Sequence, residues 1–146
     1  MSRHFYNPIF GNADAALRNA FLHCGQLAIA GQHAHITLAV SAKGNLDGMI
    51  SSFIGDEAVR VLQRDKRLVM RDLTLHLATE RIPIQHRGPV LAAFATLAHV
   101  KTLAKSPHTT HLVYIPWQED ELPAFRKLFP DAQPVPESAT QAAPPR

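Results

Sequence analysis

Histidine is the residue type with the widest scope for chemistry in this chain, which has nine of them among 146 residues. His33 and His35 are two residues apart at the start of a predicted strand, so both imidazoles should project from one face. Two such imidazoles can bind a metal ion if a third ligand comes from a distant segment, such as His76 or His111. No carboxylate or cysteine stands at ligand spacing beside them, so solvated histidines at a strand end are the competing interpretation.

A basic region between residues 60 and 87 is the one regional bias in charge. It has seven basic residues against three acidic ones, Asp65, Asp72 and Glu80. A basic stripe on one face can bind the phosphates of a nucleic acid. Because the acidic residues are interleaved, a solvated face with local ion pairs is the favoured interpretation. The candidate nucleic-acid contacts are Arg60, Arg64, Lys66, Arg67 and Arg71.

Other chemistry-bearing residues have simpler explanations. The single Cys24 is expected to be a buried thiol, and His99 is expected to be a hydrogen-bonded core histidine. No phosphate-binding, dinucleotide-binding or nucleophile-elbow pattern occurs, so no cofactor is predicted. Tyr114 and Trp117, at a predicted strand end, are candidates for a partner-binding patch, although aromatic core filling is equally ordinary.

Composition limits the class of protein. A chain of 146 residues with 18% charged residues is typical of one globular domain. No apolar run reaches the length of roughly 20 residues that spans a bilayer, so no membrane partner is expected. The N-terminus lacks a signal-peptide pattern, and one cysteine cannot form an internal disulfide. These features predict a cytoplasmic protein, and the net charge of +3 permits an acidic partner without requiring one.

A central element is predicted over residues 88–107. Pro89 suits a first helical position, and Ser106-Pro107 is typical of a helix end. Large apolar residues at short spacings with alanines between them indicate a helix that is buried on several sides. Phe94 and Leu97 are its expected core residues.

The first part of the chain is predicted to combine a helix with a hairpin. Helical spacing from Leu17 onward favours a helix to about residue 30, stopped by Gly31, although Gly25 offers an earlier end. Alternation over residues 35–41 predicts a strand, and turn chemistry after it suggests that residues 46–54 return as a second strand. Residues 56–67 fit a short helix, but a strand is a nearly equal alternative.

Two further strands and a last helix complete the predicted fold. Leu73, Leu75 and Leu77 alternate strictly, and residues 111–115 read as a strand that ends at Pro116. With the predicted helix over 88–107 between them, these strands form a β–α–β crossover. The expected fold class is a mix of α+β and α/β: one mixed sheet of about four strands with an N-terminal hairpin and helices packed on it.

Residues 1–131 are expected to form a single domain, in which residues 1–11 are an N-terminal arm. Residues 132–146 are rich in proline and alanine and are predicted to be a disordered tail. Because no acid, base and nucleophile converge, we expect a non-catalytic binding or accessory protein. It would dock on a protein partner or on nucleic acid. The alternative is a small enzyme, metal-dependent through His33 and His35. The sequence does not set the oligomeric state.

Overall fold

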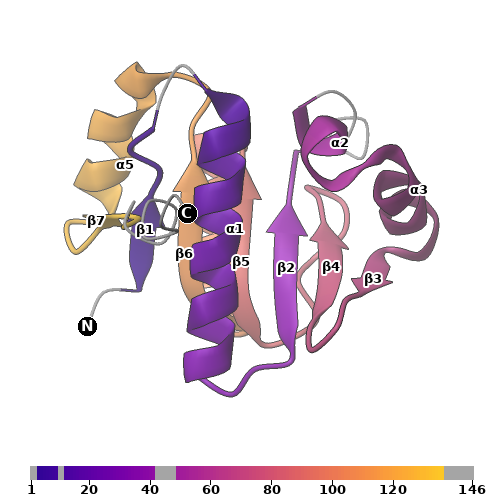
Figure 1. Ribbon diagram of the computed structural model, residues 1–146. Helices are drawn as coiled ribbons and strands as arrows, with labels where there is room; N and C mark the ends of the chain where they lie inside the picture. Colours follow the sequence, from indigo (N-terminus) through magenta and orange to yellow (C-terminus); the bar gives the residue numbers. More distant parts are fainter. Residues whose placement is uncertain (1–2, 10–11, 42–48, 137–146) are drawn as a thin grey trace, which may run out of the picture.

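A single sheet of seven strands forms the centre of the molecule (Figure 1). The computed structural model describes residues 3–9, 12–41 and 49–136. The strand order is β3-β4-β2-β5-β6-β1-β7, and all neighbours run parallel except β3 and β4. The strands are β1 (His4–Tyr6), β2 (His35–Ala39), β3 (Arg67–Val69), β4 (Thr74–Ala78), β5 (Gly88–Ala93), β6 (Thr109–Ile115) and β7 (Gln133–Pro134). The predicted mixed single sheet is therefore confirmed, but the expectation of about four strands is wrong.

Helices cover both faces of the sheet. They are α1 (Ala13–Ala30), α2 (Met49–Ile54), α3 (Asp56–Asp65), α4 (Leu97–Lys105) and α5 (Leu122–Leu128), with a short 3-10 turn at Glu119–Glu121. The buried side chains of α1, α2 and α3 join one hydrophobic cluster, and those of α4 and α5 join another. Since a strand turns successive side chains to opposite faces, these two clusters mark the two faces.

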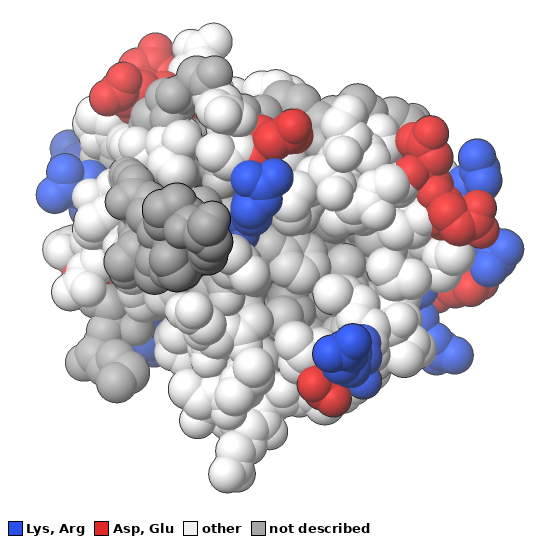
Figure 2. Space-filling model, viewed as in Figure 1, with Lys and Arg blue, Asp and Glu red and all other residues white. Residues whose placement is uncertain are grey.

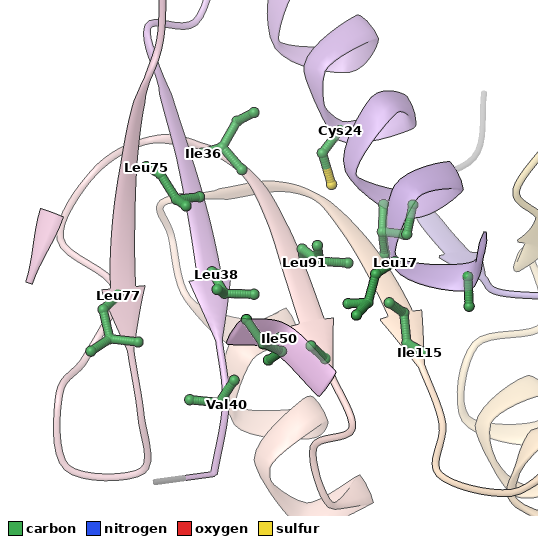
Figure 3. Packing of buried hydrophobic residues seen from close by; sticks show 14 of the residues in the cluster. Leu17, Cys24, Ile36, Leu38, Val40, Ile50, Leu75, Leu77, Leu91 and Ile115 are labelled. Atoms are coloured by element: carbon green, nitrogen blue, oxygen red, sulfur yellow. The ribbon is translucent and has the colours of Figure 1, made fainter. Parts of the chain in front are cut away.

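The first cluster lies between α1 and the sheet (Figure 3). Leu17 and the fully buried Cys24 face the sheet from α1, and Ile36, Leu38 and Leu91 meet them from β2 and β5. The helix begins directly after Asn12, whose side chain accepts a hydrogen bond from the Ala15 N–H at 3.0 Å and caps the first turn. It passes Gly25 and ends at Gly31.

The element over residues 88–107 differs from the predicted helix. Residues 88–93 form β5, every residue of which is buried, and only Leu97–Lys105 is helical. A parallel strand covered on both faces is a continuous apolar run and lacks the alternation that marks a half-exposed strand. Phe94, an expected core residue of the helix, lies after the strand and is half-buried.

The predicted N-terminal hairpin is also wrong. Residues 49–54 form α2, and β2 has two parallel neighbours, β4 and β5. Its turn, at residues 43–45, lies outside the described residues. Within 56–67, where helix and strand were both possible, residues 56–65 form the helix α3, and β3 begins at Arg67 after the cap residue Lys66.

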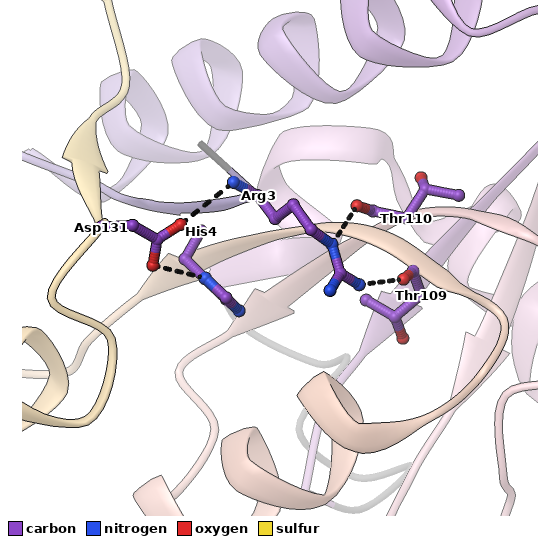
Figure 4. A network of polar contacts seen from close by, with 5 residues as sticks. All are labelled: Arg3, His4, Thr109, Thr110 and Asp131. Atoms are coloured by element: carbon purple, nitrogen blue, oxygen red, sulfur yellow. Dashed lines mark hydrogen bonds and ion pairs between the residues drawn. The ribbon is translucent and has the colours of Figure 1, made fainter. Parts of the chain in front are cut away.

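Both ends of the described chain join the sheet. The predicted N-terminal arm contains β1, which lies between β6 and β7. Figure 4 shows the side chains that hold it: the Arg3 guanidinium donates to the Thr109 and Thr110 carbonyls at 2.7 and 3.1 Å. The predicted tail, residues 132–146, includes β7, and its Val135 is 1% exposed and belongs to the first cluster. Residues 137–146 of that predicted tail lie outside the described residues.

Within the described ranges, no helix has both the length and the hydropathy that crossing a bilayer requires.

Candidate metal centre

Three histidines from separate segments meet on the face of the sheet that carries α4 and α5. His35 opens β2, His76 is the middle residue of β4, and His86 lies in the segment between β4 and β5. Ile36 and Leu75, next to these two strand histidines, point into the α1 cluster. Alternation therefore turns His35 and His76 to the opposite face. We call His35, His76 and His86 the three-histidine cluster.

The imidazole nitrogens of this cluster are close together. His35 Nδ1 and His76 Nε2 are 2.8 Å apart, a hydrogen bond in which one ring donates and the other accepts. The ring of His86 stacks on His76, with 3.8 Å between centroids and 18° between planes. One potential ligand nitrogen from each ring lies within 4.8 Å of the others. The cluster thus has three donors of the kind that binds transition metals.

Gly88 brings the third histidine to the other two. A Cβ at position 88 would collide with the backbone carbonyl of His35, so only glycine permits this close approach of β5 to the start of β2. The Gly88 N–H is held by the His108 carbonyl at 3.0 Å. Because His86 is two residues before Gly88, this contact fixes where the segment carrying His86 crosses the sheet.

The cluster favours neutral imidazoles. Burial, together with the neighbouring His86, His35 and Arg67, lowers the pKa of His76 to about 4. Burial also lowers the pKa of His86, and His35, His108 and Arg67 add to that effect. A metal ion binds the neutral form of histidine, so these two rings need lose no proton near neutral pH.

The spacing fits a tetrahedral ion after small ring movements. Two nitrogens, each 2.0–2.1 Å from a tetrahedral Zn²⁺, lie about 3.3–3.4 Å apart. The His35–His76 pair, now at 2.8 Å, would open by about 0.5 Å. The widest separation in the cluster, at most 4.8 Å, would close by up to about 1.4 Å as His86 turns from the face of His76. Three protein ligands leave the fourth position of the ion open.

A cleft of about 370 Å³ contains this cluster and two basic residues. Lys66 and Arg67 line it together with the three histidines and Thr74. Arg67 on β3 is the direct partner of His76 on β4, so the two side chains leave the sheet on the same face. The cleft therefore places a guanidinium beside the potential metal ligands.

The predicted pair His33 and His35 does not share one site. The strand begins only at His35, so alternation does not extend to His33. The ring of His33 folds back to within 2.7 Å of where a Gly31 side chain would begin, at the end of α1. It acts electrostatically on His111, whose pKa is lowered by burial, by Arg3 and by His33. The structure brings together His35 and the suggested third ligand His76, but neither His33 nor His111.

Apart from Arg67, the candidate basic residues of the 60–87 region either make hydrogen bonds or ion pairs with residues near them in the chain or are exposed. Arg60 pairs with Glu57 at 2.8 Å, and Arg64 pairs with Asp65 at 3.0 Å. Lys66 donates to the Gln63 carbonyl at the end of α3, and Arg71 is exposed. Figure 2 shows the resulting mixture of acidic and basic residues over α3.

The two aromatic residues proposed for a partner surface lie in different environments. Tyr114 is fully buried and stacks on Phe125 under α5, with 4.7 Å between ring centroids, so it contributes to the core. Trp117 is 55% exposed and lies beside Phe94, with ring centroids 4.7 Å apart. Only Trp117 can take part in a surface contact.

Sequence reasoning missed His86. It stands between Gln85 and Arg87 in a segment without periodicity, where a histidine carries no positional signal. The neighbouring Gly88 is the one local indication, since a glycine at the start of a strand often marks close backbone approach.

No protein-family model, curated protein or solved structure matches this chain at a significant level.

Proposed function

We propose that this protein binds a transition-metal ion of the Zn²⁺ class through His35, His76 and His86, and that it is a small metal-dependent enzyme. The observation that carries the proposal is the convergence of three imidazole nitrogens within 4.8 Å. They come from three separate segments, on β2, on β4 and before β5. Local sequence does not force such residues together, so their meeting is a property of the fold.

The number and type of ligands support a reactive site. Structural zinc sites are closed by four protein ligands, whereas catalytic sites use three and keep one position for water or substrate. An ion held by three imidazoles lowers the pKa of bound water to about 7 and polarises a bound oxygen. The half-exposed cluster opens into the cleft, so a small ligand can reach the fourth position.

Metal titration of the purified, chelator-treated chain tests the proposal. We expect one equivalent of Zn²⁺ to bind, and Co²⁺ to give the visible spectrum of a four-coordinate nitrogen-rich site. His76→Ala and His86→Ala should each weaken binding by about 10-fold or more, because each removes a ligand. His33→Ala is the matched control, since His33 lies two residues from His35 but outside the cluster.

Two outcomes would contradict metal binding at this site. One is no heat of Zn²⁺ binding and no Co²⁺ spectrum in a wild-type protein that is shown to be folded. The other is a loss of affinity in His33→Ala equal to that in His76→Ala, which would show that the three-histidine cluster does not define the binding site.

The second candidate is an accessory protein that docks on nucleic acid through the basic region. The observation in its favour is that Arg60, Arg64, Arg67 and Arg71 are all exposed. The Arg60 and Arg64 ion pairs reduce the charge available for phosphates. Anisotropy of labelled single- and double-stranded DNA and RNA at low salt tests it. Binding should weaken steeply with salt and be lost in the Arg64→Glu, Arg67→Glu double variant. No detectable binding would exclude it.

The accessory protein of the second candidate could instead dock on a protein partner, with Trp117 at the centre of the contact. The supporting observation is a large aromatic ring that is 55% exposed at the carboxyl end of β6. Trp117→Ala should abolish capture of a partner without lowering the thermal midpoint by more than a few degrees. A purified partner that binds Trp117→Ala as tightly as wild type would exclude this surface.

A further inference from the structure

Arg67 gives the proposed metal centre a preference for one class of ligand. We infer that the cleft binds a phosphate monoester, with one phosphate oxygen on the open metal position and two on the Arg67 guanidinium. This inference rests on the proposed metal site. It assigns what that site would act on, which the three-histidine cluster alone does not specify.

The sheet register places the guanidinium beside the metal ligands. Arg67 and His76 are direct partners across β3 and β4, and such partners have Cβ atoms about 4.5–5.5 Å apart on one face. Arg67 also lines the same cleft as all three histidines. The long side chain can therefore extend over the cluster toward a ligand bound there.

The charge of the cleft favours an anion. Its lining includes Lys66 and Arg67, and the carboxylate among the lining residues, Asp65, is held by Arg64 at 3.0 and 3.1 Å. Neutral imidazoles do not compensate the charge of a divalent ion. A loaded site therefore combines the ion with two cationic side chains and attracts a dianion more strongly than a neutral ligand.

The number of oxygens distinguishes phosphate from carboxylate. A guanidinium binds an oxyanion with two parallel hydrogen bonds, and the metal position takes one more oxygen. A phosphate monoester has three terminal oxygens and satisfies both groups at once. A carboxylate has only two oxygens, so it must lose either the contact with the metal or one of the two hydrogen bonds from the guanidinium. Thr74, which lines the same cleft and lies directly opposite His35, adds a hydroxyl at the rim.

The test is a titration of inorganic phosphate into the Co²⁺-loaded protein, followed by the visible spectrum of the ion. We expect saturable binding to wild type and a loss of about tenfold or more in Arg67→Ala, the effect of removing hydrogen bonds to a charged group. Arg67→Lys should have an intermediate phosphate affinity, because lysine retains the positive charge but cannot donate two parallel hydrogen bonds as a guanidinium does. Arg60→Ala is the matched control, since Arg60 pairs with Glu57 and does not line the cleft.

The arms of this experiment separate the two proposals. No Co²⁺ spectrum in the folded wild type removes the metal site and this inference with it. A Co²⁺ spectrum that does not respond to phosphate leaves the metal site in place and overturns the phosphate assignment alone. Equal phosphate affinity in wild type and Arg67→Ala, or acetate binding as tight as phosphate, also overturns it. Co²⁺ affinity, measured in every variant, shows whether the Arg67 substitutions leave the metal site intact.

Discussion

His4 Nδ1 and Asp131 Oδ1 lie 2.8 Å apart, which ties β1 to the segment that leads into β7. Asp131 also accepts a hydrogen bond from the Arg3 N–H at 3.2 Å (Figure 4). Burial opposes ionisation of Asp131, but these hydrogen bonds outweigh it and hold the pKa of the carboxyl below its ordinary value of 3.8. The contact therefore stabilises the folded chain only while Asp131 is ionised.

We predict that Asp131→Asn lowers the free energy of unfolding near pH 7 and has less effect near pH 3. With a lower pKa in the folded state, the unfolded chain takes up this proton first as the pH falls. The contribution is present above about pH 4 and is lost below it. Because the side chain is 47% exposed, we expect an effect within about 1 kcal/mol. Urea unfolding at both pH values measures it, and an equal loss at both would show that charge plays no part.

A second pH dependence arises under α1. Burial, aided by His111, lowers the pKa of His23 from 6.5, and its Nε2 is buried without a hydrogen-bond partner among the described residues. The folded state keeps His23 neutral while the unfolded state protonates near pH 6.5, so this stability is present above pH 6.5 and is lost below it. We expect the metal-free chain to lose urea resistance from about pH 7 to about pH 5.5. His23→Leu should make that loss smaller, and an unchanged slope would contradict the assignment.

Leu91 and Phe94 should respond differently to truncation. Leu91 is 1% exposed at the centre of β5, and Leu91→Ala should cost about 2–5 kcal/mol through lost burial and a residual cavity. Phe94 lies past the strand end with φ of 57° and contacts Trp117, so Phe94→Ala should cost clearly less. Chemical unfolding of both variants measures the difference. A larger loss in Phe94→Ala would place the core nearer the carboxyl edge of the sheet.

The end of the described chain provides a further prediction. Shortening the chain after Asp131 removes β7 and the buried Val135, whereas shortening it after Pro136 keeps both. We expect the first variant to melt several degrees below the second, since burying a valine side chain contributes about 1.5–3 kcal/mol. Equal melting temperatures would show that β1 does not need its second neighbour.

The contrast between α1 and β5 shows which parts of the fold the sequence predicts. Helical spacing from Leu17 onward is a local pattern, so α1 was predicted correctly with its end at Gly31. In β5, Val90 and Leu91 are both fully buried because each face is covered, and alternation disappears. The pairing of β2 with β4 and β5 is set by long-range packing, which no local pattern records.

The site divides along the same line. His35 and His76 each lie in a segment whose apolar residues alternate along the sequence. Both were candidates from the sequence. Their meeting depends on the pairing of β2 with β4, and the addition of His86 depends on the turn in which Thr79 and Ile82 exchange backbone hydrogen bonds. Arg67 was one of five basic candidates, and only its register opposite His76 distinguishes it from the others.

A substitution at Gly88 tests whether the close backbone approach at this position is needed for the three-histidine cluster to bind Co²⁺. Gly88→Ala places a methyl group against the His35 carbonyl, which displaces β5 or the start of β2. We expect this variant to lose stability and, in the fraction that remains folded, to bind Co²⁺ more weakly than wild type. Gly25→Ala is the matched control, because a Cβ there meets nothing within 4 Å. Unchanged Co²⁺ affinity in Gly88→Ala would show that His86 reaches the other histidines without this contact.

The place of β1 in the sheet governs the order in which the molecule can assemble during synthesis. His4 pairs with Leu112, 108 positions later (112 − 4), and Phe5 pairs with Gln133. A ribosome that adds about 5–20 residues per second needs about 5–20 seconds to cover that interval. Of the strands in this sheet, β1 is made before the others and is therefore among the last to find its neighbours. A nascent chain arrested before residue 109 should contain β2, β4 and β5 but leave Phe5 without the strands that flank it.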